Sequence, residues 1–211
     1  MIDVAHQINA VRRQVGTRTL EAGEARTVVV SQVYDAAVED VWDACTSADR
    51  IARWFLPVSG DLELGGRYQL EGNAGGTIER CDPPKSFFVT WEFGGQASWV
   101  EVRLTAEGTA RTRLEIEHIA HVGDDMWAQF GPGAVGIGWD SIFLGLSQHL
   151  SRAPAVDPSN SAAWIASAEG KQFMTLSGER WREAHVASGA DETQAREMAA
   201  RVIAAYTGAP S

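Results

Sequence analysis

Hydrophobic and polar residues alternate with a period of two through the middle of the chain, from about residue 58 to residue 119. The alternation is clearest in ASWVEVRLTA (97–106) and TRLEIEHIA (112–120), where apolar residues are interleaved with Glu and Arg. Gly, Asp-Pro-Pro and Glu-Gly turns separate the successive segments. This pattern predicts an antiparallel sheet with one wet face, in which consecutive strands pair as a meander.

Helical spacing replaces this alternation on both sides of the predicted sheet. Apolar residues at 4, 8, 11 and 15 predict a short amphipathic helix over residues 3–15, and a β-branched run at 26–34 predicts one more strand. Residues 38–45 predict a helix, and Ser47 is expected to open a second, short one. A wide apolar stripe predicts a long helix over 134–150, which needs a sheet to pack against.

A glycine-rich segment, GPGAVGIG (131–138), precedes this long helix. It lacks the Lys-Ser/Thr pair of a phosphate-binding loop. We therefore expect its glycines to let the chain bend as a loop and to let the helix approach the sheet closely. Asp140, near the predicted start of the helix, suits the positive end of the helix dipole.

The composition changes after residue 150. APAVDPSNSA (153–162) predicts a linker, with Asp157 and Pro158 suited to open a helix. The Ala-rich remainder, 161–207, predicts helices with a break near Ser188–Gly189 and a capping box at Asp191. We therefore divide the chain into a helical lead (1–22), a central domain (23–152) and a linker with a helical appendage (153–211).

Composition and charge narrow the classes of partner. The chain has 211 residues, 45% of them hydrophobic, with a net charge of −10 and eight Trp. Such a chain can bury a core, and its acidity argues against nucleic acid or an anionic membrane surface as partner. The N-terminus lacks the apolar stretch of a secretory signal, and no segment has the length of a membrane span. We expect a cytoplasmic protein.

Several motifs of the central region resemble one known family. They are VYDAAVEDVWDACTSADRIARWFLPVSGDLELGGRY (33–68), GTIERCDPPKSFFVTWEF (76–93) and GWDSIFLGLSQHL (138–150). In this order they resemble the C-terminal domain of the activator of the heat-shock-protein-90 ATPase. That family belongs to the superfamily of START lipid-transfer and birch-pollen-allergen-like domains.

The resemblance covers roughly residues 26–150 and implies a fold and a cavity. The expected fold is α+β of the helix-grip type, an antiparallel sheet of six or seven strands wrapped on the long helix. Related domains use a cavity between sheet and helix. The activator itself has a further N-terminal domain for which residues 1–25 are too short, so the family name is weak support for chaperone work.

Eight residues are candidates for lining such a cavity. Large aromatic rings can bind a flat or apolar ligand, although ordinary core packing is the preferred explanation for any single one. Trp99 alternates onto the face of Glu101 and is the weakest member. The candidate ligand-binding residues are Trp54, Phe55, Tyr68, Trp91, Trp99, His118, Trp139 and Phe143.

His118 is in register with Leu114 and Ile116 and should point inward. It could orient the polar end of a ligand, as could Tyr68, or act as a general base, or simply be a satisfied core histidine. His121 follows three residues later, but this H-x-x-H spacing without a further ligand is poor evidence for a metal site. Asp124–Asp125 indicates the start of a helix. We predict no catalytic residue, no metal and no cofactor.

Three hypotheses of function follow. The first is reversible binding of a hydrophobic or aromatic small molecule in a cavity between sheet and long helix. The second is a protein-interaction role, either linked to heat-shock protein 90 or as a homodimer through the C-terminal helices. The third is an enzyme of the cyclase or hydrolase kind, which would depend on His118.

Overall fold

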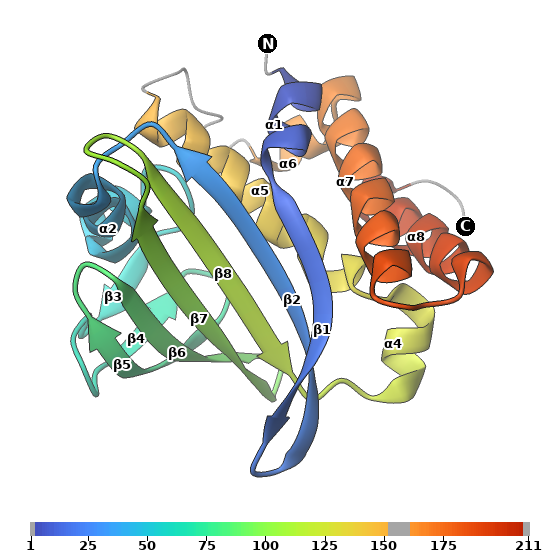
Figure 1. The fold of residues 1–211 in the computed structure, drawn as a ribbon, viewed down its shortest axis with the longest axis horizontal. Coiled ribbons are helices and arrows are strands. Elements are labelled where there is room, and N and C mark those ends of the chain that lie inside the picture. The colour runs from blue at the N-terminus through green and yellow to red at the C-terminus, as the bar shows by residue number, and fades with distance from the viewer. Residues whose placement is uncertain (1–2, 152–160, 209–211) are drawn as a thin grey trace. The chain divides into compact units, whose positions relative to one another are not determined.

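A computed structural model describes residues 3–151 and 161–208 of the chain. Its eight strands form one sheet in the order β1-β2-β8-β7-β6-β5-β4-β3 (Figure 1). The strands are β1 (Arg12–Leu20), β2 (Gly23–Tyr34), β3 (Val58–Gly60), β4 (Arg67–Leu70), β5 (Gly75–Asp82), β6 (Ser86–Phe93), β7 (Gln96–Ala106) and β8 (Thr112–Ala120). The helices are α1 (Val4–Ala10), α2 (Val38–Thr46), α3 (Ala48–Ile51), α4 (Asp124–Phe130), α5 (Gly133–Leu150), α6 (Ser161–Ala166), α7 (Ala168–Ala187) and α8 (Glu192–Thr207).

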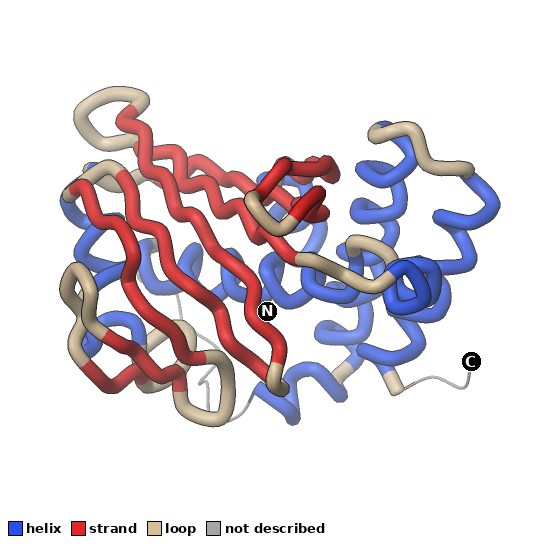
Figure 2. The backbone as a smooth tube through the Cα atoms, turned by 90° about the horizontal axis from the view of Figure 1, so that it is seen from below, coloured by secondary structure: helices blue, strands red, loops and turns tan. Residues whose placement is uncertain are grey.

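The strands from β3 to β8 pair antiparallel, each with the next along the chain. Figure 2 shows these strands lying side by side in the sheet. Buried and less buried residues alternate along β7 and β8, as a sheet with one wet face requires. The predicted meander and the α+β helix-grip class are confirmed. The strand count is eight instead of six or seven, because β1 occupies a segment that we expected to be helical.

The predicted N-terminal helix is too long. Asp3 caps α1 through a hydrogen bond to the backbone N–H of His6 (2.9 Å), and the helix ends at Ala10. Residues 12–20 form β1, whose burial alternates along most of its length. Val11 and Val15 continue the helical spacing by coincidence, since the Gly16-Thr-Arg-Thr sequence that follows favours strand over helix.

The glycine-rich segment is helical for most of its length. Gly131 ends α4 with a positive φ of 57°, and α5 already begins at Gly133. The predicted long helix over 134–150 is therefore confirmed with one more residue at its start, and the loop expected for the glycine-rich segment is confined to Gly131 and Pro132. Asp140 consequently lies in the interior of α5 rather than in its first turn, and the helix-dipole role expected for it is wrong.

The C-terminal helices follow the prediction closely. Asp191 accepts a hydrogen bond from the N–H of Gln194 (2.9 Å) and so caps α8, and the chain reverses at Ser188–Gly189 between α7 and α8. α7 and α8 pack side by side as a hairpin (Figure 1). The predicted linker is outside the described residues from 153 to 160, including Asp157 and Pro158.

The chain divides into two compact units that interleave in sequence. Among the described residues, the first unit contains 3–30, 121–143 and 161–208, and the second contains 31–120 and 144–151. β2 and α5 each run from one unit into the other. The division into three parts, 1–22, 23–152 and 153–211, stays a prediction.

The core of the first unit is formed by the C-terminal hairpin and α1. α1 and β1 both contact α7, and α4 contacts α8. Fully buried side chains here include Ile8, Phe173 and Trp181. Apolar residues of α7 and α8 such as Phe173 and Met198 are thus buried within this unit. No helix in the described part of the chain is both long and apolar enough to cross a membrane.

Candidate functional site

The sheet of the second unit has one apolar and one charged face. Trp91 lies opposite Ser98, and Val100 lies opposite His118. Because directly paired residues of antiparallel strands project to the same side, this register places all of them on one face. We call it the apolar face, and it includes Tyr68, Ile78, Phe87, Val89, Trp91, Ser98, Val100, Val102, Leu104, Leu114, Ile116 and His118.

The opposite face is held by an ion-pair network around Arg103. Its guanidinium lies 2.8 Å from Glu115, 3.0 Å from Glu101 and 3.2 Å from Glu117. Trp99 pairs with Thr90 and Ile119 and therefore lies on this face as well. The register thus separates Trp99 from the other aromatic candidates of the sheet.

His118 is the one titratable imidazole of the apolar face, and it is 8% exposed. Its Nε2 lies 2.9 Å from Oγ of Ser98, whose hydroxyl donates to the carbonyl oxygen of Trp91 (3.1 Å). Since that hydroxyl has a single proton, Ser98 accepts from Nε2–H of His118, which assigns the Nε2-protonated tautomer. Burial lowers the pKa of His118 to about 4, so the ring is neutral near pH 7.

Trp91 and Tyr68 place two large rings on the same face. The ring of Trp91 lies 6.3 Å from that of His118, tilted by 56°. The hydroxyl of Tyr68 donates to the carbonyl oxygen of Thr90 (2.7 Å), and burial, followed by the nearby Glu92, raises the pKa of this phenol. Tyr68 therefore contributes its ring to the apolar face, while its hydroxyl proton is engaged in the hydrogen bond to the backbone of Thr90.

Trp54 and Phe55 lie just after α3 in the same unit. Their rings stack at 5.9 Å, and Nε1 of Trp54 donates to the carbonyl oxygen of Ala44 in α2 (3.1 Å). A Cβ at Gly145 of α5 would lie 2.4 Å from the carbonyl oxygen of Trp54. The glycine therefore lets the last turns of α5 approach this segment closely.

Trp139 and Phe143 belong to the first unit. Both lie on α5 and are buried, Trp139 at 6% exposure and Phe143 at 0%. As a set, the eight candidates stay a prediction. Five of them have hydrogen-bond or ring contacts within the second unit: Trp54, Phe55, Tyr68, Trp91 and His118.

The weaker candidates take structural roles. The imidazole of His121 is exposed and lies 3.2 Å, at Nδ1, from the carbonyl oxygen of Glu24. Asp124 and Asp125 occupy the first turn of α4, as expected for a helix start, and Asp124 pairs with Arg26 (3.0 Å). Among the residues that the structure describes, no group of three or more potential metal ligands comes together.

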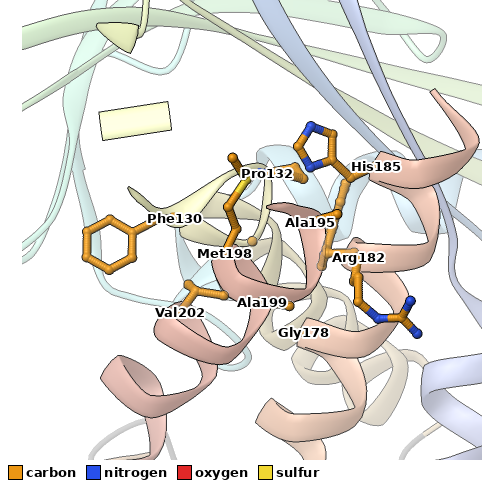
Figure 3. Close-up of a pocket in the computed structure, with 11 residues that line it drawn as sticks. Phe130, Pro132, Gly178, Arg182, His185, Ala195, Met198, Ala199 and Val202 are labelled. Carbon is orange, nitrogen blue, oxygen red and sulfur yellow. The ribbon is translucent and has the colours of Figure 1, made fainter. Parts of the chain in front are cut away.

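A small hollow opens in the first unit beside the C-terminal hairpin (Figure 3). Met198, Ala199 and Val202 of α8 line one side of it. A Cβ at Gly133 would lie 2.8 Å from Val202, and one at Gly131 3.1 Å from the sulfur of Met198. The hollow is therefore a gap between tightly packed helices rather than a preformed ligand site.

Sequence reasoning missed a buried ion pair in the same unit. Nε of Arg13 in β1 lies 2.9 Å from Asp140, whose carboxylate also accepts a hydrogen bond from the hydroxyl of Ser177 in α7. Burial raises the pKa of Asp140, and Arg13 and Ser177 oppose that rise. The buried Nε1 of Trp181 also lowers the pKa of this carboxyl group. No local signal joins these residues, because they are far apart in sequence.

Comparisons with known proteins agree with this architecture. The model of the family described as activator of Hsp90 ATPase homolog 1-like protein matches residues 35–151, more than half of the chain. No curated protein matches the chain.

Among solved structures, CalU16 from Micromonospora echinospora is 36% identical to this chain, with a TM-score of 0.68. The match covers 86% of this chain and 99% of CalU16, so it extends beyond the region of the family model. Protein MLL2253 from Mesorhizobium loti is 26% identical over 61% of this chain and 99% of its own, with a TM-score of 0.54.

An HSP90 activator from Plasmodium falciparum shares the fold. It is 20% identical over 61% of this chain and 97% of its own, with a TM-score of 0.52. The family model and the CalU16 match together assign the chain: it belongs to the family of activator of Hsp90 ATPase homolog 1-like proteins.

Proposed function

We propose that this chain reversibly binds a hydrophobic, aromatic small molecule on the apolar face of the second unit, between the sheet and the last turns of α5 (Leu144–Leu150). One observation carries the proposal. A neutral His118–Ser98 pair lies beside the ring of Trp91 on a face that is otherwise apolar. Such a combination of ring surface with one fixed polar group is typical of small-molecule sites.

Ring burial would supply most of the affinity. Removing a large aromatic side chain from such a contact costs about 1.5–3 kcal/mol, which corresponds to roughly a 10- to 100-fold loss of affinity. The His118–Ser98 pair would orient a polar end of the ligand. Trp54 and Phe55 are further candidates for lining the proposed site. Trp139 and Phe143 also remain candidates, because they lie on α5, whose last turns form one side of the proposed site.

Two tryptophans on opposite faces provide the test. Trp91→Ala should weaken binding of the probe N-phenyl-1-naphthylamine, measured by its fluorescence, by roughly 10- to 100-fold. Trp99→Ala removes the same ring from the charged face and should leave the affinity unchanged. Equal losses in both variants, or no binding by the wild-type chain, would contradict the proposal. Native mass spectrometry of the purified chain would identify a molecule that it carries along.

A protein-interaction role is the alternative. The family name suggests Hsp90, and the C-terminal helices suggest a homodimer. Stimulation of Hsp90 ATPase activity by the purified chain, and its mass by sedimentation, test these two ideas. The apolar residues of α7 and α8 are largely buried in the chain itself, so a dimer would have to use the exposed faces of these helices.

An enzymatic role would require His118 as a general base. A base is most effective when its pKa lies near the working pH, and burial lowers the pKa of His118 to about 4. This supports binding over proton abstraction. Turnover that disappears in a folded His118→Ala variant would favour the enzyme instead.

A further inference from the structure

We infer that the ligand of the apolar face is an electrically neutral molecule, and that the site discriminates against anionic analogues of the same shape. This inference rests on the proposed function and specifies the chemical class of its ligand. It follows from the way in which the sheet distributes its charges between its two faces.

Every ionisable carboxylate and guanidinium of β6, β7 and β8 projects away from the apolar face. The register places Glu101 opposite Glu117, and Arg103 opposite Glu115, on the other side of the sheet. The complete set on that side is Glu92, Glu101, Arg103, Arg113, Glu115 and Glu117. No cation of these strands is therefore available to a ligand on the apolar face.

The cations on the charged face are also engaged. Arg103 contacts three carboxylates, and Arg113 forms an ion pair with Glu107. At the start of β4, Arg67 lies 2.9 Å from Glu92. A ligand anion could recruit one of these side chains only by breaking its ion pairs and moving it through the sheet.

Within β6, β7 and β8, His118 is the remaining candidate for a counter-ion. Its Nε2–H is held by Ser98, and its surroundings in β7 and β8 are Val100 and Ile116, which favour the neutral ring. The charged groups of the neighbouring strands, Glu101 and Glu117, lie on the other face. The low pKa of His118 agrees with this environment.

An anion buried on this face would therefore lose its hydration without gaining a partner from β6, β7 or β8. The burial of an unpaired charge is unfavourable even after the protein relaxes. Its cost is large enough to weaken the affinity for an anion by more than about tenfold. A hydroxyl, carbonyl or amide carries no such penalty once it is hydrogen-bonded. The polar end of the ligand is accordingly uncharged.

Two probes that differ by one sulfonate test the inference on the full chain. N-phenyl-1-naphthylamine is neutral, and 8-anilinonaphthalene-1-sulfonate adds the anion to the same ring system. We expect the neutral probe to bind at least about tenfold more tightly, with a signal that is lost in Trp91→Ala and retained in Trp99→Ala.

The possible outcomes separate the two proposals. If both probes bind with equal affinity and both depend on Trp91, the neutral-ligand inference is overturned and the proposed function stands. If neither probe binds, both are overturned.

A charge placed on the apolar face provides a second test. Ser98→Lys adds an ammonium group beside His118 and should shift the preference toward the sulfonate by at least about tenfold. Ala97→Lys adds the same charge one residue earlier, on the other face, and should leave the preference of the wild-type chain unchanged. An identical shift in both variants would show a long-range charge effect and would overturn the inference.

Discussion

Arg13 and Asp140 form a buried ion pair whose side chains are only 4% and 0% exposed. Arg13 also donates from Nη1 to the carbonyl oxygens of Ile8 and Val11. Such a pair adds little net stability over apolar residues of the same shape, but the removal of one partner leaves the other charge buried and unpaired. The pair therefore holds β1 against α5 mainly because separating the two charges would be strongly unfavourable.

We expect Asp140→Ala to lower the free energy of unfolding by about 3–5 kcal/mol, because it leaves the Arg13 guanidinium buried without a counter-ion. Urea denaturation followed by circular dichroism measures this change. The double variant Arg13→Met with Asp140→Leu removes both charges and should recover most of the loss. An exposed pair, Glu192 and Arg196, provides the control, since Glu192→Ala should change stability by less than about 0.5 kcal/mol.

The burial of His118 predicts a specific dependence of stability on pH. Its pKa falls to about 4 in the fold, below the unfolded value of about 6.5. The neutral ring is favoured when folded, so its contribution is complete above pH 6.5 and is lost as the pH falls toward 4. At pH 4 the loss amounts to about 3 kcal/mol relative to neutral pH.

Replacement of His118 by Gln should remove this part of the acid sensitivity. Urea denaturation at several pH values between 7.5 and 4 would show a smaller decline of stability in the variant than in the wild-type chain. His121→Gln removes an exposed imidazole and should keep the wild-type profile. A His118→Gln profile that parallels the wild type would show that the imidazole is not buried in its neutral form.

At the scale of elements, Gly136 in the first half of α5 is explained by the C-terminal hairpin. A Cβ at Gly136 would lie 2.2 Å from Cε2 of Trp181 in α7. In α7 itself, a Cβ at Gly178 would lie 2.4 Å from Cγ1 of Ile203 in α8. Glycine is unfavourable in a helix by about 1 kcal/mol relative to alanine, and here it permits contact between three helices.

Two glycines of α5 make a matched pair for this interpretation. Gly136→Ala should destabilise the chain by about 1–3 kcal/mol through overpacking against the Trp181 ring. Gly138→Ala meets only the hydroxyl of Tyr206 at 3.6 Å and should be neutral or stabilise by up to about 1 kcal/mol. Thermal denaturation of both variants tests the difference, and equal melting temperatures would contradict the packing argument.

At the scale of the molecule, the first unit is assembled from both ends of the chain and from the first half of α5. Ser177 and Trp181 of α7 complete the surroundings of Asp140, and α8 covers Gly131 and Gly133. The C-terminal helices are therefore part of the core of this unit.

Removal of these helices should consequently disrupt the first unit. A chain that ends at residue 155 is expected to elute as larger, self-associated species in size-exclusion chromatography, because it exposes the glycine-rich surface of α5 and the Asp140 carboxylate. A chain that ends at residue 208 loses only three residues and should behave as the full chain does. A well-folded monomer ending at residue 155 would show that the helices are dispensable.

Much of the fold could be predicted from the sequence because its cause is local. The alternation along β7 and β8 reflects the burial of one face by each strand, and the Asp191 cap depends on a residue only three positions away. The same local pattern identified Trp99 as the weakest of the aromatic candidates. The family resemblance is carried by motifs of this local kind.

The remaining features depend on contacts between distant segments. Val11 and Val15 fit a helical spacing, yet Val15 lies in β1, the edge strand of the sheet, and Val11 directly precedes it, because strand pairing is decided by neighbours far along the chain. Gly136 is explained by Trp181, 45 positions later, and Asp140 is paired with Arg13, 127 positions earlier. Periodicity shows which side of an element is buried, and the identity of the covering element is set only when the whole chain has folded.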